Sequence, residues 1–113
     1  IKKTNLIKFV KMIIKRISPN ELTDLIQKKS DISIVDIREL YEIENDGKLD
    51  SSIHIPMGDL VNKLGKIPKS EKIIFHCSSG KRSENILNFL IMNNLYQDNY
   101  FNLEGGFNAN NKK

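Results

Sequence analysis

The stretch EKIIFHCSSGKRSENILNFLI, residues 71–91, combines a strand, a tight loop and a helix in one segment. The segment 71–77 is short and rich in isoleucine and phenylalanine, which is typical of a buried strand. The polar loop 78–82 follows, and Ser83 is of a residue type that caps helices. Apolar residues then recur at helical spacing, namely Ile86, Leu87, Leu90 and Ile91, with Phe89 beside them. This segment predicts a strand that delivers the only cysteine of the chain, Cys77, to a loop in front of a helix.

The rest of the chain repeats this alternation. Ser18, Pro19 and Glu21 form a helix start with a capping box, ahead of an amphipathic run. The other predicted elements are strands at 31–37, 51–56 and 99–103, short helices at 38–47 and 57–68, and a turn at 104–107. Alternating strands and helices predict an α/β fold, a small parallel sheet with helices on both faces. Functional loops of such sheets lie at the carboxyl ends of the strands, where Cys77 is expected.

Length and composition indicate one ordinary domain. The chain has 113 residues, of which 39% are hydrophobic and 28% charged, values that favour neither disorder nor a membrane protein. A single cysteine forms no internal disulfide, which favours a reducing, cytoplasmic compartment. We expect a basic N-terminal segment at 1–16, a domain at 17–108 and a polar tail at 109–113.

The basic charge is concentrated in residues 1–16, which hold six lysines and arginines and no acidic residue. Because the rest of the chain is slightly acidic, the net charge of +4 does not indicate a nucleic-acid partner. The segment is open to three interpretations: a surface helix or poorly ordered arm, a weak targeting segment, or residues upstream of a start at Met12. Its apolar runs are too short for a transmembrane helix, which needs about 20 residues.

The cysteine loop has the composition of an anion site. A free thiol with a pKa of about 8.5 is mostly protonated at neutral pH, so a nucleophilic cysteine needs surroundings that favour negative charge. Lys81, Arg82, the loop N–H groups and the following helix N-terminus provide them, and Gly80 allows a sharp turn. The alternative is a small buried core cysteine. No metal site is expected, since there is no second cysteine and the adjacent His76 points to the opposite face of the strand.

Four segments resemble the rhodanese (sulfurtransferase) domain, in the family's order. They are CSSGKRS (77–83), similar to its Cys-x-x-Gly-x-Arg-Ser loop; VDIRELYEI (35–43), similar to its Asp-x-Arg-Glu segment; GKLDSSIHIP (47–56), a degraded form of its Gly-His-Ile-Pro-Gly-Ala-x-x-Ile-Pro stretch; and LEGGF (103–107), similar to its Leu-x-Gly-Gly segment. The resemblance covers residues 18–108. The chain departs from the pattern at Lys48, Asp50 and Ser51, and at Asn110, where the family usually has tryptophan.

The resemblance implies a three-layer rhodanese-like α/β fold and a thiosulfate sulfurtransferase that needs no cofactor. Cys77 would take a sulfur atom from an anionic donor such as thiosulfate or mercaptopyruvate, and a thiol, a protein or cyanide would remove it. The predicted substrate-binding residues are Ser78, Ser79, Gly80, Lys81, Arg82 and Ser83. Related phosphatases have five residues between Cys and Arg, whereas this loop has four, which suits a sulfur atom better than a phosphate.

Several neighbouring residues have simpler interpretations. Asp36 and Arg38 are either a surface or interlayer ion pair or a support for the cysteine loop. His54 is expected to be a structural strand residue, and Phe75, Phe89 and Phe101 to lie in the core. The altered 48–51 segment and the missing tryptophan leave a second function open, a rhodanese-like binding or regulatory module without turnover.

Overall fold

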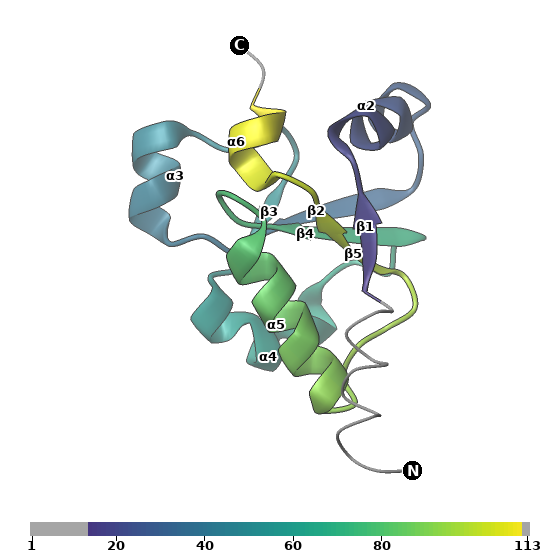
Figure 1. Cartoon of the computed structure of the whole chain (residues 1–113), viewed down its shortest axis with the longest axis vertical. Coiled ribbons are helices and arrows are strands. Elements are labelled where there is room, and N and C mark those ends of the chain that lie inside the picture. Colours follow the sequence, from purple (N-terminus) through teal and green to yellow (C-terminus); the bar gives the residue numbers. More distant parts are fainter. Residues whose placement is uncertain (1–13, 112–113) are drawn as a thin grey trace.

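The computed structural model describes residues 14–111, which form five parallel strands in the order β1-β5-β4-β2-β3 (Figure 1). The strands are β1 (Lys15–Ile17), β2 (Ile32–Asp36), β3 (Ile53–His54), β4 (Lys72–His76) and β5 (Tyr100–Leu103). The helices are α2 (Pro19–Gln27), α3 (Leu40–Asp46), η1 (Met57–Asp59), α4 (Leu60–Lys63), η2 (Leu64–Lys66), α5 (Lys81–Met92) and α6 (Gly106–Asn110). None of the helices in this range is long and apolar enough to cross a membrane.

The sheet separates two apolar cores because successive side chains of a strand point to opposite faces. One core contains Val35, Phe75 and Cys77, packed against Leu60 of α4 and against Leu87 and Leu90 of α5. The other contains Ile34, Ile74 and Leu103, packed against Leu22 and Leu25 of α2. Helices therefore cover both faces of a parallel sheet, as Figure 1 shows, and the predicted three-layer α/β fold is confirmed.

The predicted start of the first helix is confirmed in detail. The Glu21 N–H donates to Ser18 Oγ at 3.1 Å, and the Ser18 N–H donates to the Glu21 carboxylate at 3.0 Å. Pro19 occupies the first turn, where its missing N–H costs nothing. This capping box fixes the direction of the chain between β1 and α2.

The prediction that Ser83 caps the next helix is wrong. Helix α5 already begins at Lys81, and Gly80, with φ +98°, is its N-cap. Glycine adopts this left-handed conformation without the steric cost of a side chain, so the helix begins three residues earlier than expected. Ser83 instead lies inside the first turn with its side chain buried.

Two other sequence predictions need correction. Residues 104–107 were expected to form a turn before a polar tail, but helix α6 begins at Gly106 and extends into that tail. Phe89 was expected in the core, yet 47% of it is exposed, because Leu87 and Leu90 form the face of α5 that packs on the sheet. Phe75 is buried as predicted, and Phe101 is partly buried against the α2 side.

The end of the basic N-terminal segment is a strand and not a helix. Lys15 and Arg16 belong to β1, which pairs with β5 at the edge of the sheet. Residues 1–13 of the basic segment and residues 112–113 of the polar tail lie outside the described residues, so the interpretations given for them from the sequence stay predictions.

Candidate active site

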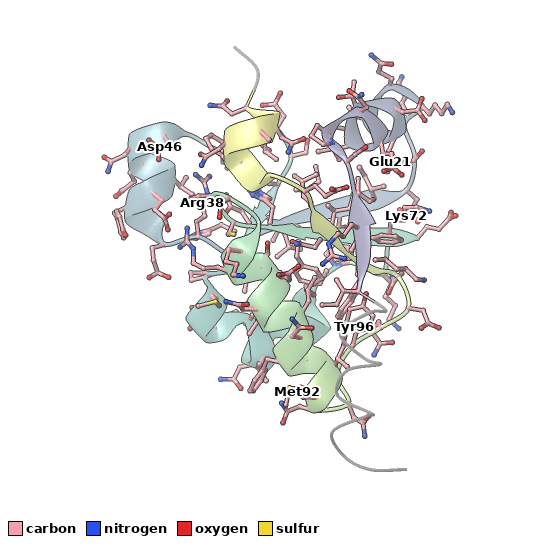
Figure 2. All side chains as sticks on the ribbon, viewed as in Figure 1. Glu21, Arg38, Asp46, Lys72, Met92 and Tyr96 are labelled. Atoms are coloured by element: carbon pink, nitrogen blue, oxygen red, sulfur yellow. The ribbon has the colours of Figure 1, made fainter. Side chains whose placement is uncertain are left out.

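Cys77 directly follows β4, at the carboxyl end of the central strands, and its side chain is fully buried. Figure 2 shows Arg38 at this same end, between α3 and α6, while Lys72 at the start of β4 lies at the opposite end. The loop that follows Cys77 leads into α5 and is covered by α6. The structure thus brings the predicted loop residues 78–83 together around one thiol.

Hydrogen-bond donors surround the Cys77 sulfur. The N–H groups of Gly80 and Ser83 lie 3.1 and 3.4 Å from Sγ, and the Ser83 hydroxyl lies 3.6 Å from it. Burial raises the pKa of the Cys77 thiol, but hydrogen bonds from the Ser83 hydroxyl and from the N–H groups of Ser83, Gly80 and Ser79 lower it by more. The net pKa therefore lies below the ordinary value, which favours the nucleophilic thiolate.

Asn102 is a site residue that the sequence did not reveal. Its side-chain oxygen accepts a hydrogen bond from the Ser83 hydroxyl at 2.6 Å, and its Nδ2 donates to the Gly80 carbonyl at 3.2 Å. The Ser83 hydroxyl has one proton and three acceptors within reach, Asn102 Oδ1, the Gly80 carbonyl at 3.1 Å and the Cys77 sulfur, so Asn102 competes with the sulfur for this proton. The sequence signal that could have revealed Asn102 is a polar residue within the predicted strand 99–103, between apolar neighbours.

Helix α6 binds the outer side of the cysteine loop. The N–H groups of Phe107 and Asn108 donate to the carbonyls of Cys77 and Ser78 at 2.8 and 2.9 Å. Because these carbonyls are held on the α6 side, the N–H groups of the loop remain free to point at the sulfur. The GGF segment therefore shapes the site although it does not contact the thiol.

Arg82 does not stand free as an anion-binding side chain. Its two terminal nitrogens donate to the Glu42 carboxylate at 2.9 and 2.7 Å. Ser78 Oγ also belongs to this network, because it donates to Glu42 and accepts from Arg82. The hydrogen bond from Arg82 holds the pKa of Glu42 at about 2, and Glu42 raises the pKa of Arg82. Glu42, which lies on α3 and is 40 residues from Arg82, was not predicted from the sequence.

Lys81 and Ser79 lie on the exposed side of the loop. The Lys81 N–H donates to Ser79 Oγ at 3.3 Å, and Lys81 forms no ion pair within residues 14–111. Lys81 is therefore the cation of the loop that is available to a ligand.

Asp36 and Arg38 form a fully buried pair. The Arg38 guanidinium donates to both oxygens of Asp36, at 2.8 to 3.2 Å, and to the Gly47 carbonyl at 2.8 Å. Burial raises the pKa of the Asp36 carboxyl, but Arg38 and His76 lower it by more, and burial keeps the pKa of His76 below its usual value. Arg38 also stacks on the Phe107 ring at 4.1 Å, so it reaches the cysteine loop through α6.

The remaining histidine and the atypical residues have local contacts. His54 Nε2 bonds to the Arg38 carbonyl at 2.7 Å, in keeping with the structural role expected for it. Lys48 Nζ donates to the Ser52 carbonyl, and Asn110 Nδ2 donates to the carbonyls of Glu104 and Gly106. Among the described residues, no group of three or more His, Cys, Asp and Glu side chains is placed to bind a metal.

Comparisons with known proteins agree with this architecture. The sequence model of the family described as "Rhodanese-like domain" matches residues 18–113. The chain is 34% identical over 79 residues to the Bacillus subtilis (strain 168) protein named "Putative sulfurtransferase YtwF", which covers 70% of this chain and 76% of that protein.

Two solved structures show the same fold. The rhodanese-like domain protein from Staphylococcus aureus has a TM-score of 0.72 and 28% identity, covering 86% of this chain and 91% of that one. The rhodanese-related protein from Thermoplasma volcanium has a TM-score of 0.69 and 27% identity, covering 85% and 89%. With the cysteine loop, the parallel sheet and the family match in agreement, this chain belongs to the rhodanese-like family.

Proposed function

We propose that the protein is a sulfurtransferase that carries a sulfur atom as a persulfide on Cys77. The observation that carries this proposal is the set of N–H and O–H donors around a buried sulfur, which lowers the pKa of the thiol. Such a ring of donors stabilises a thiolate before the reaction and a persulfide anion after it.

The reaction has two balanced steps. The Cys77 thiolate attacks the outer sulfur of thiosulfate; a new S–S bond forms on Cys77, the S–S bond of the donor breaks, and sulfite leaves with the electron pair. An acceptor thiolate, or cyanide in an assay, then attacks the outer sulfur of the Cys77 persulfide, and the Cys77 thiolate leaves. Neither step needs a cofactor or an external oxidant.

In this mechanism the N–H groups of residues 78–83 hold the persulfide, and Lys81 attracts an anionic donor. Asp36 and Arg38 support the loop through Phe107. We propose a small thiol or a protein thiol as the acceptor, in a reducing, cytoplasmic compartment that keeps the single cysteine available for this cycle.

Two observations favour the second candidate function, a binding or regulatory module without turnover. The Cys77 sulfur is fully buried, and the arginine of the loop is already paired with Glu42. A protein with these features could keep the loop as a structural element while its surface binds a partner.

Intact mass spectrometry separates the two candidates. The protein is measured before and after incubation with thiosulfate, with mercaptopyruvate and with a small persulfide donor, and again after cyanide. We expect a gain of about 32 Da, one sulfur atom, on Cys77 that cyanide removes. The matched control is Cys77→Ser, which is nearly isosteric, and should fold but gain no mass.

An unchanged mass with all three donors would reject the sulfurtransferase and support the binding module. A mass gain that persists in Cys77→Ser would place the sulfur elsewhere and reject the proposed mechanism.

A further inference from the structure

The Glu42 carboxylate occupies the edge of Arg82 that would otherwise bind an oxyanion. Both terminal nitrogens of Arg82 donate to it, at 2.9 and 2.7 Å, in the two-point geometry that guanidinium groups also use for sulfonate-like anions. Ser78 Oγ donates to Glu42 at 3.0 Å and accepts from Arg82 at 3.0 Å, which closes the network. A donor must displace Glu42 before it can use Arg82.

Displacing Glu42 is unfavourable because the network is partly shielded from water. The Glu42 side chain is 14% exposed and that of Arg82 36%. The hydrogen bond from Arg82 keeps the pKa of Glu42 at about 2, so the carboxylate is ionised at any pH used for an assay. Glu42 therefore acts as a permanent negative charge next to the cysteine loop.

The four charges of the cysteine loop and of the network that covers it consequently cancel. The Cys77 thiolate and Glu42 are negative, and Arg82 and Lys81 are positive. A donor with one negative charge adds one unbalanced charge to this group, whereas a dianion such as thiosulfate adds two. Like charges at short range weaken binding in proportion to the charge of the ligand.

We infer that Glu42 is a specificity-determining residue that makes the site favour sulfur donors with a single negative charge, such as organic persulfides and thiosulfonates, over dianionic thiosulfate. This inference rests on the proposed sulfurtransferase function. For a thiosulfonate, the Cys77 thiolate attacks the terminal sulfur, the S–S bond of the donor breaks, and a singly charged sulfinate leaves with the electron pair.

The test compares two donors of similar shape and different charge. Thiosulfate is a dianion, and methanethiosulfonate replaces one of its oxygens by a methyl group and is a monoanion. Values of kcat/KM are measured for both donors with cyanide as acceptor, in the wild-type protein and in Glu42→Gln. The matched control is Glu44→Gln, which removes an exposed carboxylate from the same helix, α3, away from Arg82.

We expect the ratio of kcat/KM for thiosulfate to that for methanethiosulfonate to rise roughly three- to tenfold in Glu42→Gln, the effect of removing one like charge from a partly solvated site. The change should appear as a lower KM for thiosulfate. In Glu44→Gln the ratio should stay within about twofold of the wild-type value.

Each other outcome has a distinct meaning. An unchanged ratio in a folded Glu42→Gln variant, or an equal loss of activity with both donors, would overturn the inference, since Glu42 would then only position Arg82. If no sulfur is transferred from either donor to the wild-type protein, the proposed function itself fails.

If Glu42→Gln does not fold, the wild-type protein still provides a test. Normalised to the uncatalysed reactions with cyanide, its kcat/KM for methanethiosulfonate must exceed that for thiosulfate at least about threefold. A wild-type protein that prefers thiosulfate after this normalisation contradicts the inference.

Discussion

Replacing Gly106 by alanine tests how closely α6 packs on the cysteine loop. A Cβ at this position would lie 2.4 Å from the Cys77 carbonyl oxygen and 2.7 Å from that of Ser78, and these are backbone atoms that cannot rotate away. Gly106 also has φ +55°, in the left-handed region. The substitution therefore imposes a conformational cost and a steric one.

Two other glycines separate these costs. Gly47 has φ +80° and ψ −173°, a conformation almost restricted to glycine, but open space around it, so Gly47→Ala should show only a conformational cost, about 1–3 kcal/mol. Gly58 has open space and no positive φ, so Gly58→Ala should change the free energy of unfolding by less than about 0.5 kcal/mol, or stabilise slightly. Gly106→Ala combines the left-handed cost, about 1–2 kcal/mol, with the displacement of backbone, typically about 1–3 kcal/mol, and should lose roughly 2–5 kcal/mol in all.

Urea unfolding of the three variants measures these differences, and the alkylation rate of Cys77 against pH reports on the site. Moving α6 should lengthen the bonds from Phe107 and Asn108 to the loop carbonyls, so we expect Gly106→Ala alone to change the apparent pKa of Cys77. If Gly106→Ala is no less stable than Gly47→Ala and Cys77 reacts as in the wild type, the close packing argument is refuted.

Two further predictions concern buried polar groups. Asp36→Asn should lose about 3–5 kcal/mol of stability because it leaves the Arg38 charge buried without its partner. The control Asp59→Asn breaks an exposed ion pair and should lose less than about 1 kcal/mol. Equal losses of the two variants in urea unfolding would contradict this prediction. The pKa of the Asp36 carboxyl is lower in the folded protein than in the unfolded chain. The stability that its ion pair contributes is therefore present above the pKa of the unfolded carboxyl and is lost as the pH falls through the pKa of the folded one. The loss of stability in acid should consequently be smaller in Asp36→Asn than in the wild type. Ser83→Ala removes a hydroxyl that lowers the pKa of Cys77, so the midpoint of the pH profile of Cys77 alkylation should move to higher pH. A midpoint that stays or falls would mean that the N–H groups alone lower the pKa of Cys77.

The sequence predicted those parts of the fold that local chemistry determines. The short segment 71–77 contains β4, and the Ser18 capping box begins α2, because each signal is complete within a few neighbouring residues. The position of Cys77 followed from the rule that loops at the carboxyl ends of parallel strands form the site. These predictions needed no knowledge of tertiary contacts.

The missed features depend on contacts between distant segments. Glu42 and Arg82 are 40 positions apart, and Ser83 and Asn102 are 19 apart, so no local spacing links them. Ser83 has the residue type of a helix cap, but the left-handed conformation of Gly80 moved the helix start and placed its hydroxyl in the site. Helical periodicity correctly placed Leu87 and Leu90 on the face of α5 that packs on the sheet, but it did not show that Phe89 lies off that face.

We propose that the buried Asp36–Arg38 pair affects the site by position and not by charge. Asp36 neutralises the guanidinium, and no hydrogen bond joins Arg38 to the Cys77 sulfur within the described residues. The plane of Arg38 instead supports the Phe107 ring at 4.1 Å, and the Phe107 N–H holds the Cys77 carbonyl at 2.8 Å. Full burial excludes the surface ion pair considered from the sequence. The pair therefore acts as a rigid support for α6, which in turn keeps the loop N–H groups directed at the sulfur.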